Sequence, residues 1–548
     1  MRAAAIVLGV CAFGFTLLTT KGLTNDHYMY LGWAQQVQLG DVPGRDFVDP
    51  GMPLQYMLSA AALSLMPGPA AEVLVTTALL GLAAGFTCFG VSRLTGSLTA
   101  GVLAATFQTS LDPRLYSYPK VLVPAVALVL ALAYARRPGR RTLAAMALWT
   151  ATAFLLRPDL GMFTGVMVAI VVAATATRMS TAAVNTGMLA AFTAAALVPY
   201  VLYVAWAEGV AWKVAAAFEF LKGESHQFGF YQPPLRLGAL LPAIGVPAEP
   251  IDGAAFLYYL SYALIAATIV LLALRWRRIH AHHRPVLLGL VALAAMFGVV
   301  IIRHPITARI PDAAAVIAIL GSWCTVETIR AVSGLAGGAG MAARTAAWGT
   351  VTMLLTLTAV SVDALGHVRE EIRESQITEG LGSVRARALS VIHDGETWPW
   401  APYWPAGDIP EVVTYIRECT RPQDRLLMTW PAPEFFFFAQ RGFSAGHVML
   451  QPGTFTGPEH QRLMVSRLER DRPPIALINE TGRPAFAASF PAVDAYVSRR
   501  YLPVQRFSLR DGSEVVLAVR SDWHPTGSYG RDRLPCEAAP ATVAVGRP

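Results

Sequence analysis

The sequence predicts a polytopic α-helical membrane protein with a soluble α/β domain at its C-terminal end. Three observations lead to this fold class. The 548 residues are 54% hydrophobic and only 15% charged, whereas soluble proteins carry about 25% charged residues. Apolar stretches recur up to residue 362, many of them close to the roughly 20 residues that a bilayer-crossing helix needs. Beyond residue 362 the pattern changes to short helix and strand signals.

Hydropathy indicates about eleven spans, of which the first is 3–20. No small-x-small cleavage pattern precedes Lys21, so this segment is interpreted as a retained helix and not as a signal peptide. The stretch 53–66 fits either a further span or a helix at the membrane interface. The other candidate spans are 70–92, 97–111, 120–135, 142–156, 160–177, 182–206, 254–274, 286–302, 311–329 and 345–362.

The distribution of charge predicts the orientation in the membrane. Residues 1–362 hold 23 basic and 14 acidic residues, an excess of +9, so the net charge of +8 of the whole chain arises in the membrane part and does not indicate nucleic-acid binding. Alternate loops collect 13 of these basic residues and one acid, Glu327. Under the positive-inside rule these loops and the N-terminus are cytoplasmic, and an odd number of spans places the tail outside. The inner basic residues are Arg2, Arg93, Arg136, Arg137, Arg140, Arg141, Arg178, Arg275, Arg277, Arg278, Arg284, Arg330 and Arg344.

The tail is predicted to be an α/β domain. We divide the chain into a transmembrane catalytic domain, 1–362, with a first external loop at 21–53, and an extracytoplasmic domain, 363–548, that opens with the charged connecting segment His367–Arg387. Asp511-Gly512 is a hairpin signal, and the end from about residue 521 is expected to be irregular. Predicted helices are 408–418, 435–438, 459–471 and 491–501, and predicted strands are 424–430, 475–479, 504–509 and 514–519.

Of the five cysteines, only Cys419 and Cys536 lie in the polar tail. A disulfide between them requires an oxidising compartment. Sequence alone does not set their distance, so the pairing stays open.

The first external loop is the most informative stretch for function. Asp26 opens a short predicted helix whose face also carries Tyr30 and Trp33 at helical spacing. Asp46 and Asp49 follow in a turn-rich segment. Acids gather in outside loops simply because water is there, but two clusters of acid, aromatic and glycine around one amphipathic helix favour a chemical role.

These motifs resemble those of the GT-C glycosyltransferases, in particular the bacterial mannosyltransferase and aminoarabinose-transferase type. The resemblance includes the first-loop acid Asp26 and the Gly-x-x-Pro-x-Arg-Asp-Phe segment 40–47. Downstream it includes the Arg-Pro-Asp turn in 156–161, the Arg-x-x-Asp of 309–312 and the tail segment 424–434. Each motif is short, and it is their order along nearly the whole chain that carries the resemblance.

The resemblance implies an enzyme that moves a sugar from a polyprenyl-phosphate donor to a lipid, glycan or protein acceptor on the outer face of the bacterial cytoplasmic membrane. Two departures bear on a metal. His27 follows Asp26 where the family often has a second acid, and Ala314 and Ala315 occupy the place of an expected histidine. A divalent cation therefore stays open, and His27 is interpreted as a solvated loop residue.

The chemistry assigns roles to the candidate residues. A carboxylate must take the proton of the acceptor, and we assign this role to Asp26, with Asp46 and Asp49 as further catalytic candidates. Fixed cations must stabilise the departing phosphate. The candidates at predicted outer span ends are Arg157, Lys120, Arg303 and Arg309. Their alternative role is snorkelling or pairing with Asp159 and Asp312.

Other interpretations are weighed against this one. A transporter or lipid-linked glycan flippase would place ionisable residues near the bilayer midplane and often shows repeats, whereas here the acids lie at span ends and no repeat is visible. An inactive scaffold of the same fold is a third interpretation.

No Gly-x-Gly-x-x-Gly or Gly-Lys-Ser/Thr loop indicates a nucleotide or nicotinamide cofactor. The aromatic run 398–404 fits sugar stacking or, preferably, an interfacial belt.

Overall fold

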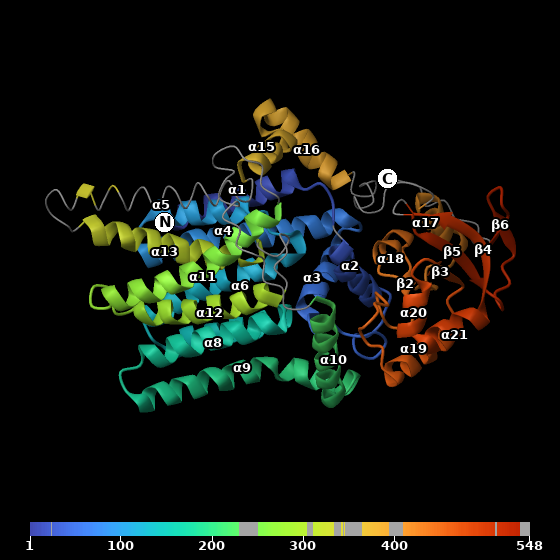
Figure 1. The fold of residues 1–548 in the computed structure, drawn as a ribbon, viewed down its shortest axis with the longest axis horizontal. Helices are drawn as coiled ribbons and strands as arrows, with labels where there is room; N and C mark the ends of the chain where they lie inside the picture. Colours follow the sequence, from blue (N-terminus) through green and yellow to red (C-terminus); the bar gives the residue numbers. More distant parts are fainter. Residues whose placement is uncertain are drawn as a thin grey trace. The chain divides into compact units, whose positions relative to one another are not determined.

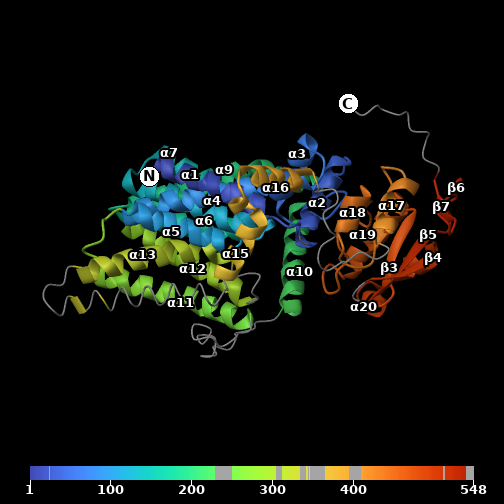
Figure 2. The same cartoon turned by 90° about the horizontal axis from the view of Figure 1, so that it is seen from above.

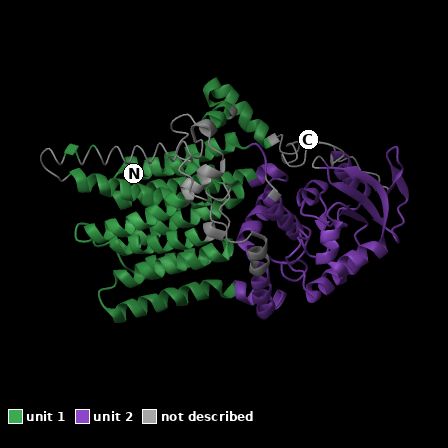
Figure 3. Ribbon diagram, in the orientation of Figure 1, with its two compact units in different colours: residues 1–20, 73–199, 228–393 green, residues 21–72, 200–227, 394–548 purple. Residues whose placement is uncertain are grey.

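The computed structural model describes residues 1–23, 25–228, 250–303, 311–333, 341–342, 345, 364–393, 409–509 and 512–537. The chain forms two compact units (Figure 3). Unit 1 contains residues 1–20, 73–199 and 228–393, and unit 2 contains residues 21–72, 200–227 and 394–548. The predicted division at residue 363, which separates a membrane part from a soluble part, stays a prediction.

Unit 1 is built from long helices that lie side by side (Figures 1 and 2). Helices α4 and α9 begin and end, respectively, in unit 2. The helices are α1 (Arg2–Thr19), α4 (Pro69–Thr95), α5 (Leu98–Ser110), α6 (Tyr118–Arg136), α7 (Arg140–Leu156), α8 (Pro158–Thr175), α9 (Met179–Ala207), α11 (Pro250–Arg275), α12 (Arg284–Arg303) and α13 (Ala314–Ser333).

The predicted spans can be compared with these helices. A helix lies at each predicted span from 3–20 to 311–329, and the predicted span 345–362 lies outside the described residues apart from Thr345. Six helical stretches in the described part of the chain are long and apolar enough to cross a membrane, so the protein is a multi-pass membrane protein. The stretch 53–66 forms α3 (Pro53–Leu65), whose 13 residues are fewer than the roughly 20 of a span. The number of spans stays a prediction.

Small residues let helices of unit 1 approach closely. A Cβ atom added to Gly81 of α4 would lie 2.7 Å from the carbonyl oxygen of Gly9 and 2.8 Å from Cβ of Phe13, both on α1. On α5, a Cβ at Gly101 would lie 2.4 Å from the Cys88 carbonyl oxygen of α4. Such contacts are how helices pack where lipid removes the hydrophobic drive for association.

The charged connecting segment is largely helical. It forms α15 (Ala364–Ser375), the 3₁₀ turn η4 (Ile377–Glu379) and α16 (Leu381–His393). Arg387 of α16 donates hydrogen bonds to the carbonyl oxygens of Leu18 (3.1 Å) and Thr20 (2.9 Å). These carbonyls belong to the end of α1, where the helix itself supplies no donors.

Unit 2 contains a five-stranded mixed sheet in the order β2-β1-β3-β5-β4. Strand β1 runs parallel to β2 and β3, whereas β5 is antiparallel to β3 and β4. The elements are α17 (Ile409–Cys419), β1 (Arg425–Met428), α18 (Glu434–Ala439), β2 (Gly442–Phe443), α19 (Pro458–Asp471), β3 (Ile475–Asn479), α20 (Arg483–Ser489), α21 (Pro491–Arg500), β4 (Tyr501–Ser508) and β5 (Glu514–Arg520).

The α/β prediction for the tail is confirmed. Every predicted helix and strand has a counterpart, and β4 and β5 pair as the hairpin that Asp511-Gly512 signals. Residues 527–536 are more regular than expected, because β6 (Gly527–Tyr529) and β7 (Leu534–Cys536) pair as a small ribbon. A disulfide joins Cys419 at the end of α17 to Cys536 in β7, so this ribbon is covalently attached to the helix.

The first loop shares a hydrophobic core with the tail. It forms α2 (Asn25–Gln38) and α3, and Trp33, Phe47 and Tyr56 are buried in one cluster with the sheet residues of unit 2. The Phe47 ring lies 5.7 Å from the Phe443 ring of β2. Helix α10 (Val210–Phe228) also belongs to unit 2. The first loop is thus part of a folded unit and not a free connection.

Candidate active site

Asp26 lies in the first turn of α2 and is exposed. The residues that follow it anchor the helix: His27 and Tyr28 are 1% and 2% exposed. Further along α2, the Tyr30 and Trp33 rings meet edge to face at 5.6 Å. The predicted face of the helix is therefore packed at Tyr30 and Trp33, and its N-terminal end presents a carboxylate to solvent.

His27 is not the solvated residue that the sequence suggested. Its Nε2 lies 2.7 Å from Oε1 of Glu72, and both side chains are buried. The expectation failed because the partner, Glu72 in the first turn of α4, lies 45 residues away and no local pattern reveals it. Removing one partner of such a buried pair is strongly destabilising, so the pair holds the start of α2 in place next to Asp26.

Asp46 is surrounded by hydrogen-bond donors. It accepts bonds from the Val42 backbone N–H (2.9 Å) and from Nη2 of Arg45 (2.8 Å), and Nη1 of Arg470 lies 3.3 Å away. Burial opposes ionisation of Asp46, but the bonds from Arg45 and Val42 outweigh it and lower the pKa of the carboxyl. A carboxylate stabilised in this way is a weak proton acceptor.

Asp49 is buried in a polar network. Its carboxylate accepts bonds from the Tyr56 hydroxyl (3.2 Å), the Tyr200 hydroxyl (3.1 Å) and Nζ of Lys213 (2.7 Å). Lys213 also pairs with Glu208 at 3.0 Å. This network ties the first loop to the end of α9 and to α10, so Asp49 acts as an anchor of the loop.

Asp41 has a partner that the sequence did not reveal. Oδ1 accepts a bond from Nη2 of Arg425 (2.7 Å), and Oδ2 accepts one from Nε2 of Gln36 (2.6 Å). Gln36 also donates to the carbonyl oxygen of Phe443. Asp41 therefore links α2 to strands β1 and β2.

Two of the predicted phosphate-binding cations lie in unit 1 and are paired with acids. Lys120, near the start of α6, pairs with Asp312, and both side chains are mostly buried. Nε of Arg157 lies 2.8 Å from Asp159, and the Arg157 side chain is 28% exposed. Arg157 sits at the junction between α7 and α8. Arg157 and Asp159 are neighbours in the sequence, whereas Lys120 and Asp312 are 192 residues apart.

The other two cations give less information. Arg303 is the last residue of α12, and its side chain lies outside the described residues, as does the whole of Arg309. The aromatic run 398–404 also lies outside the described part of the chain. The assignment of a phosphate site to these cations therefore stays a prediction.

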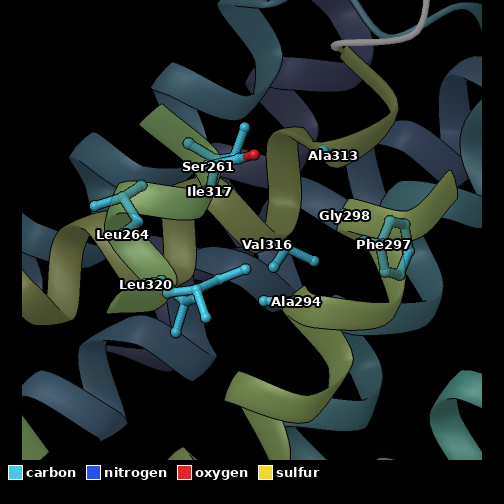
Figure 4. A pocket seen from close by; sticks show the side chains of 10 residues that line it. Ser261, Leu264, Ala294, Phe297, Gly298, Ala313, Val316, Ile317 and Leu320 are labelled. Atoms are coloured by element: carbon cyan, nitrogen blue, oxygen red, sulfur yellow. The ribbon is translucent and has the colours of Figure 1, made fainter. Parts of the chain in front are cut away.

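An apolar pocket lies between three helices of unit 1 (Figure 4). Leu264 of α11, Phe297 of α12 and Ile317 of α13 are among its lining side chains, and Ser261 supplies a hydroxyl. The pocket also reaches Ala313, which directly follows Asp312. The lining is almost entirely apolar, and Asp312, the partner of Lys120, directly precedes it in the chain.

Metal binding finds no support in the described residues. Within them, no three or more His, Cys, Asp or Glu side chains are arranged to hold a metal ion.

The site residues that sequence reasoning missed are Glu72, Glu208 and Lys213. No local motif marks Glu72 and Lys213, because their partners His27 and Asp49 lie 45 and 164 residues away in the chain. Glu208 joins the site through its pair with Lys213.

Comparisons with known proteins add a likeness of the whole chain. No protein-family model and no curated protein matches it. Among solved structures, it is similar to ArnT from Cupriavidus metallidurans bound to undecaprenyl phosphate, with 13% identity and a TM-score of 0.46 over 95% of this chain and 98% of that one. The apo state of the same protein gives 14% identity and a TM-score of 0.40 over 94% and 97%. With TM-scores below 0.5, these likenesses leave the chemistry of this chain to be inferred from its own residues.

Proposed function

We propose that the protein is an integral membrane glycosyltransferase of the GT-C type. It transfers a sugar from a polyprenyl-phosphate donor to an acceptor hydroxyl or amine on the outer face of the bacterial cytoplasmic membrane. The observation that carries the proposal is the exposed carboxylate of Asp26 on a helix start that is held rigidly by buried neighbours. The other two first-loop candidates are less exposed, since Asp46 is partly buried and Asp49 is buried.

The reaction assigns one task to each group. Asp26 accepts the proton of the acceptor as its oxygen or nitrogen attacks the anomeric carbon. The bond between that carbon and the phosphate oxygen breaks, and polyprenyl phosphate leaves with the negative charge. Arg157, Lys120, Arg303 and Arg309 are the proposed cations for this charge. Arg157 is the best placed of the described ones, since its guanidinium is partly exposed and bonded to Asp159 through Nε.

The direct test is an assay with purified protein, a panel of radiolabelled polyprenyl-phosphate sugars and membrane extracts as acceptors. Transfer of label to an acceptor with at least one donor is the expected result. A transporter or flippase would move labelled lipid between leaflets of a vesicle without forming a new glycoside. Lipid movement without any product would therefore reject the proposal.

The location outside is supported by two independent features. The inner loops carry 13 basic residues against one acid, and the tail contains the Cys419–Cys536 disulfide, which is typical of oxidising compartments. Reporter fusions at Arg140 and at Gly512 are expected to report opposite sides, with Gly512 outside. Reporters on the same side would reject the orientation and with it the placement of Asp26.

A further inference from the structure

A cluster of three histidines lies in the loop between α11 and α12 of unit 1. The ring of His282 is 5.6 Å from that of His280 and 4.3 Å from that of His283. Arg284 holds the loop: its Nε donates to the Ile279 carbonyl oxygen (3.2 Å), and its guanidinium lies 5.1 Å from the centre of the Trp276 ring. The histidines therefore form one ordered group.

Arginines from three other helices contribute positive charge near this group. Arg93 in the last turn of α4, Arg136 at the end of α6 and Arg330 in the last turn of α13 all act electrostatically on these imidazoles. Arg330 also donates a hydrogen bond to the carbonyl oxygen of Thr95, the last residue of α4. The bond from Arg330 thus joins the ends of α13 and α4. We call the three histidines and the arginines that act on them or hold their loop the basic cluster: His280, His282, His283, Arg93, Arg136, Arg284 and Arg330.

The balance of charge in the basic cluster is positive. Glu327 neutralises part of it, since it pairs with Arg275 (2.8 Å) and Arg330 (3.5 Å). Burial, together with the neighbouring imidazoles and arginines, lowers the pKa of His283 to about 4 and also lowers that of His282. These two imidazoles stay neutral at physiological pH, and each can still donate a hydrogen bond from a ring N–H.

Membrane topology does not explain the histidines. The positive-inside rule concerns Lys and Arg, so it accounts for the arginines and leaves three adjacent imidazoles without a reason. Guanidinium groups bind phosphate oxygens through paired N–H donors. Basic pockets between membrane helices are recognised binding places for lipid head groups.

We propose that the basic cluster binds a phosphate group, carried by an acidic membrane lipid or free in solution. Arg93 and Arg136 supply charge and paired N–H donors, and the neutral imidazoles of His282 and His283 supply single N–H donors. The site belongs to unit 1 alone and does not depend on the proposed glycosyl transfer.

The test uses the full chain in nanodiscs. One arm adds phosphatidylglycerol to a phosphatidylcholine bilayer and counts retained lipid by native mass spectrometry. The other arm titrates inorganic phosphate into phosphatidylcholine nanodiscs and follows the thermal shift. Saturable binding of at least one probe is expected, and the arm that saturates identifies the source of the phosphate.

Variants link the binding to the cluster. The double change His282→Asn and His283→Asn is expected to weaken binding about tenfold, the equivalent of ~1.4 kcal/mol. The double change Arg93→Lys and Arg136→Lys keeps the positive charges that the membrane topology requires but removes the paired N–H donors of the guanidinium groups. Phosphate binding should therefore also weaken. Arg277→Lys, in the same loop and exposed, is the matched control and should bind normally.

Two results would overturn the proposal: no saturable binding of either probe, or equal affinity in the wild type and in both double variants. If the histidine variant does not fold, the arginine-to-lysine variant still decides the outcome, because it preserves charge and side-chain length.

Discussion

Asp26→Asn is expected to lower turnover by roughly 10²–10⁴-fold, the range for loss of a general base. The amide keeps the shape of the side chain but cannot accept the proton of the acceptor. Donor binding should change little, since the proposed phosphate ligands lie elsewhere in the chain. Single-turnover transfer from a labelled donor measures the chemical step, and equilibrium binding of the same donor measures the control quantity.

Asp49→Asn and Asp46→Asn are the matched comparisons within the same loop. Asp49→Asn removes the carboxylate that faces Lys213 and two tyrosine hydroxyls, so it should lower thermal stability as well as activity. Asp46→Asn should have a smaller effect on the chemical step, because its carboxylate is bonded to Arg45. Normal sugar transfer by a well-folded Asp26→Asn variant would mean that Asp26 is not the general base, and Asp46 or Asp49 would become the leading candidate.

The parts of the fold that could be predicted from sequence are those set by local patterns. Strand β3 occupies Ile475–Asn479, as predicted, because a short apolar run bounded by polar residues is a local signal. The helices at the predicted spans also follow from a local signal, the long apolar stretch. In lipid such a stretch must form a helix, because its backbone groups can be hydrogen-bonded only within the segment.

Contacts between distant segments could not be predicted in this way. Phe47 of the first loop packs on Phe443 of the tail, and Arg425 bonds to Asp41 across 384 residues. Both Phe47 and Asp41 looked like loop residues, because a turn-rich segment carries no periodicity that would reveal burial. The first loop was therefore treated as separate from the tail, although the two share a core.

The candidate site shows the same limit. Arg157 and Asp159 are two residues apart, and their pairing was weighed from sequence. Asp312 was named only as a general pairing partner of the candidate cations, and its contact with Lys120, 192 residues away, was not predicted. Local spacing can suggest such a pair, but a fold is needed to bring the groups together.

Glu434 is expected to make the stability of the protein fall as pH rises from about 4.5 to about 7. The side chain is 1% exposed, and neither carboxyl oxygen has a hydrogen-bond partner of normal geometry among the described residues. Burial raises its pKa from 4.5 to about 7, and contact with its own backbone N–H only partly opposes this shift. The same carboxyl contributes, after burial, to a raised pKa of the Tyr28 hydroxyl on α2.

The sign follows from proton linkage. Below pH 4.5 the carboxyl is protonated in both the folded and the unfolded chain, so it adds no pH dependence to the stability. Between 4.5 and about 7 the unfolded chain releases its proton while the folded chain retains it, and stability is lost. Above about 7 the folded protein must bury a carboxylate, and the total loss amounts to about 3 kcal/mol at 1.36 kcal/mol per pKa unit.

Glu434→Gln and Glu434→Leu remove the titrating group, so both variants should lose this part of the pH dependence. Apparent melting temperatures of the wild type and the two variants, measured from pH 4 to pH 8 in the same nanodiscs, provide the comparison. The melting temperature of the wild type should fall relative to that of each variant as pH rises, and the difference between them should become constant above about pH 7. The Leu variant separates titration from hydrogen bonding, since it introduces no buried amide. Parallel curves for all three proteins would mean that Glu434 has a partner that satisfies its charge, and that α18 meets the Tyr28 face of α2 without a buried titrating group.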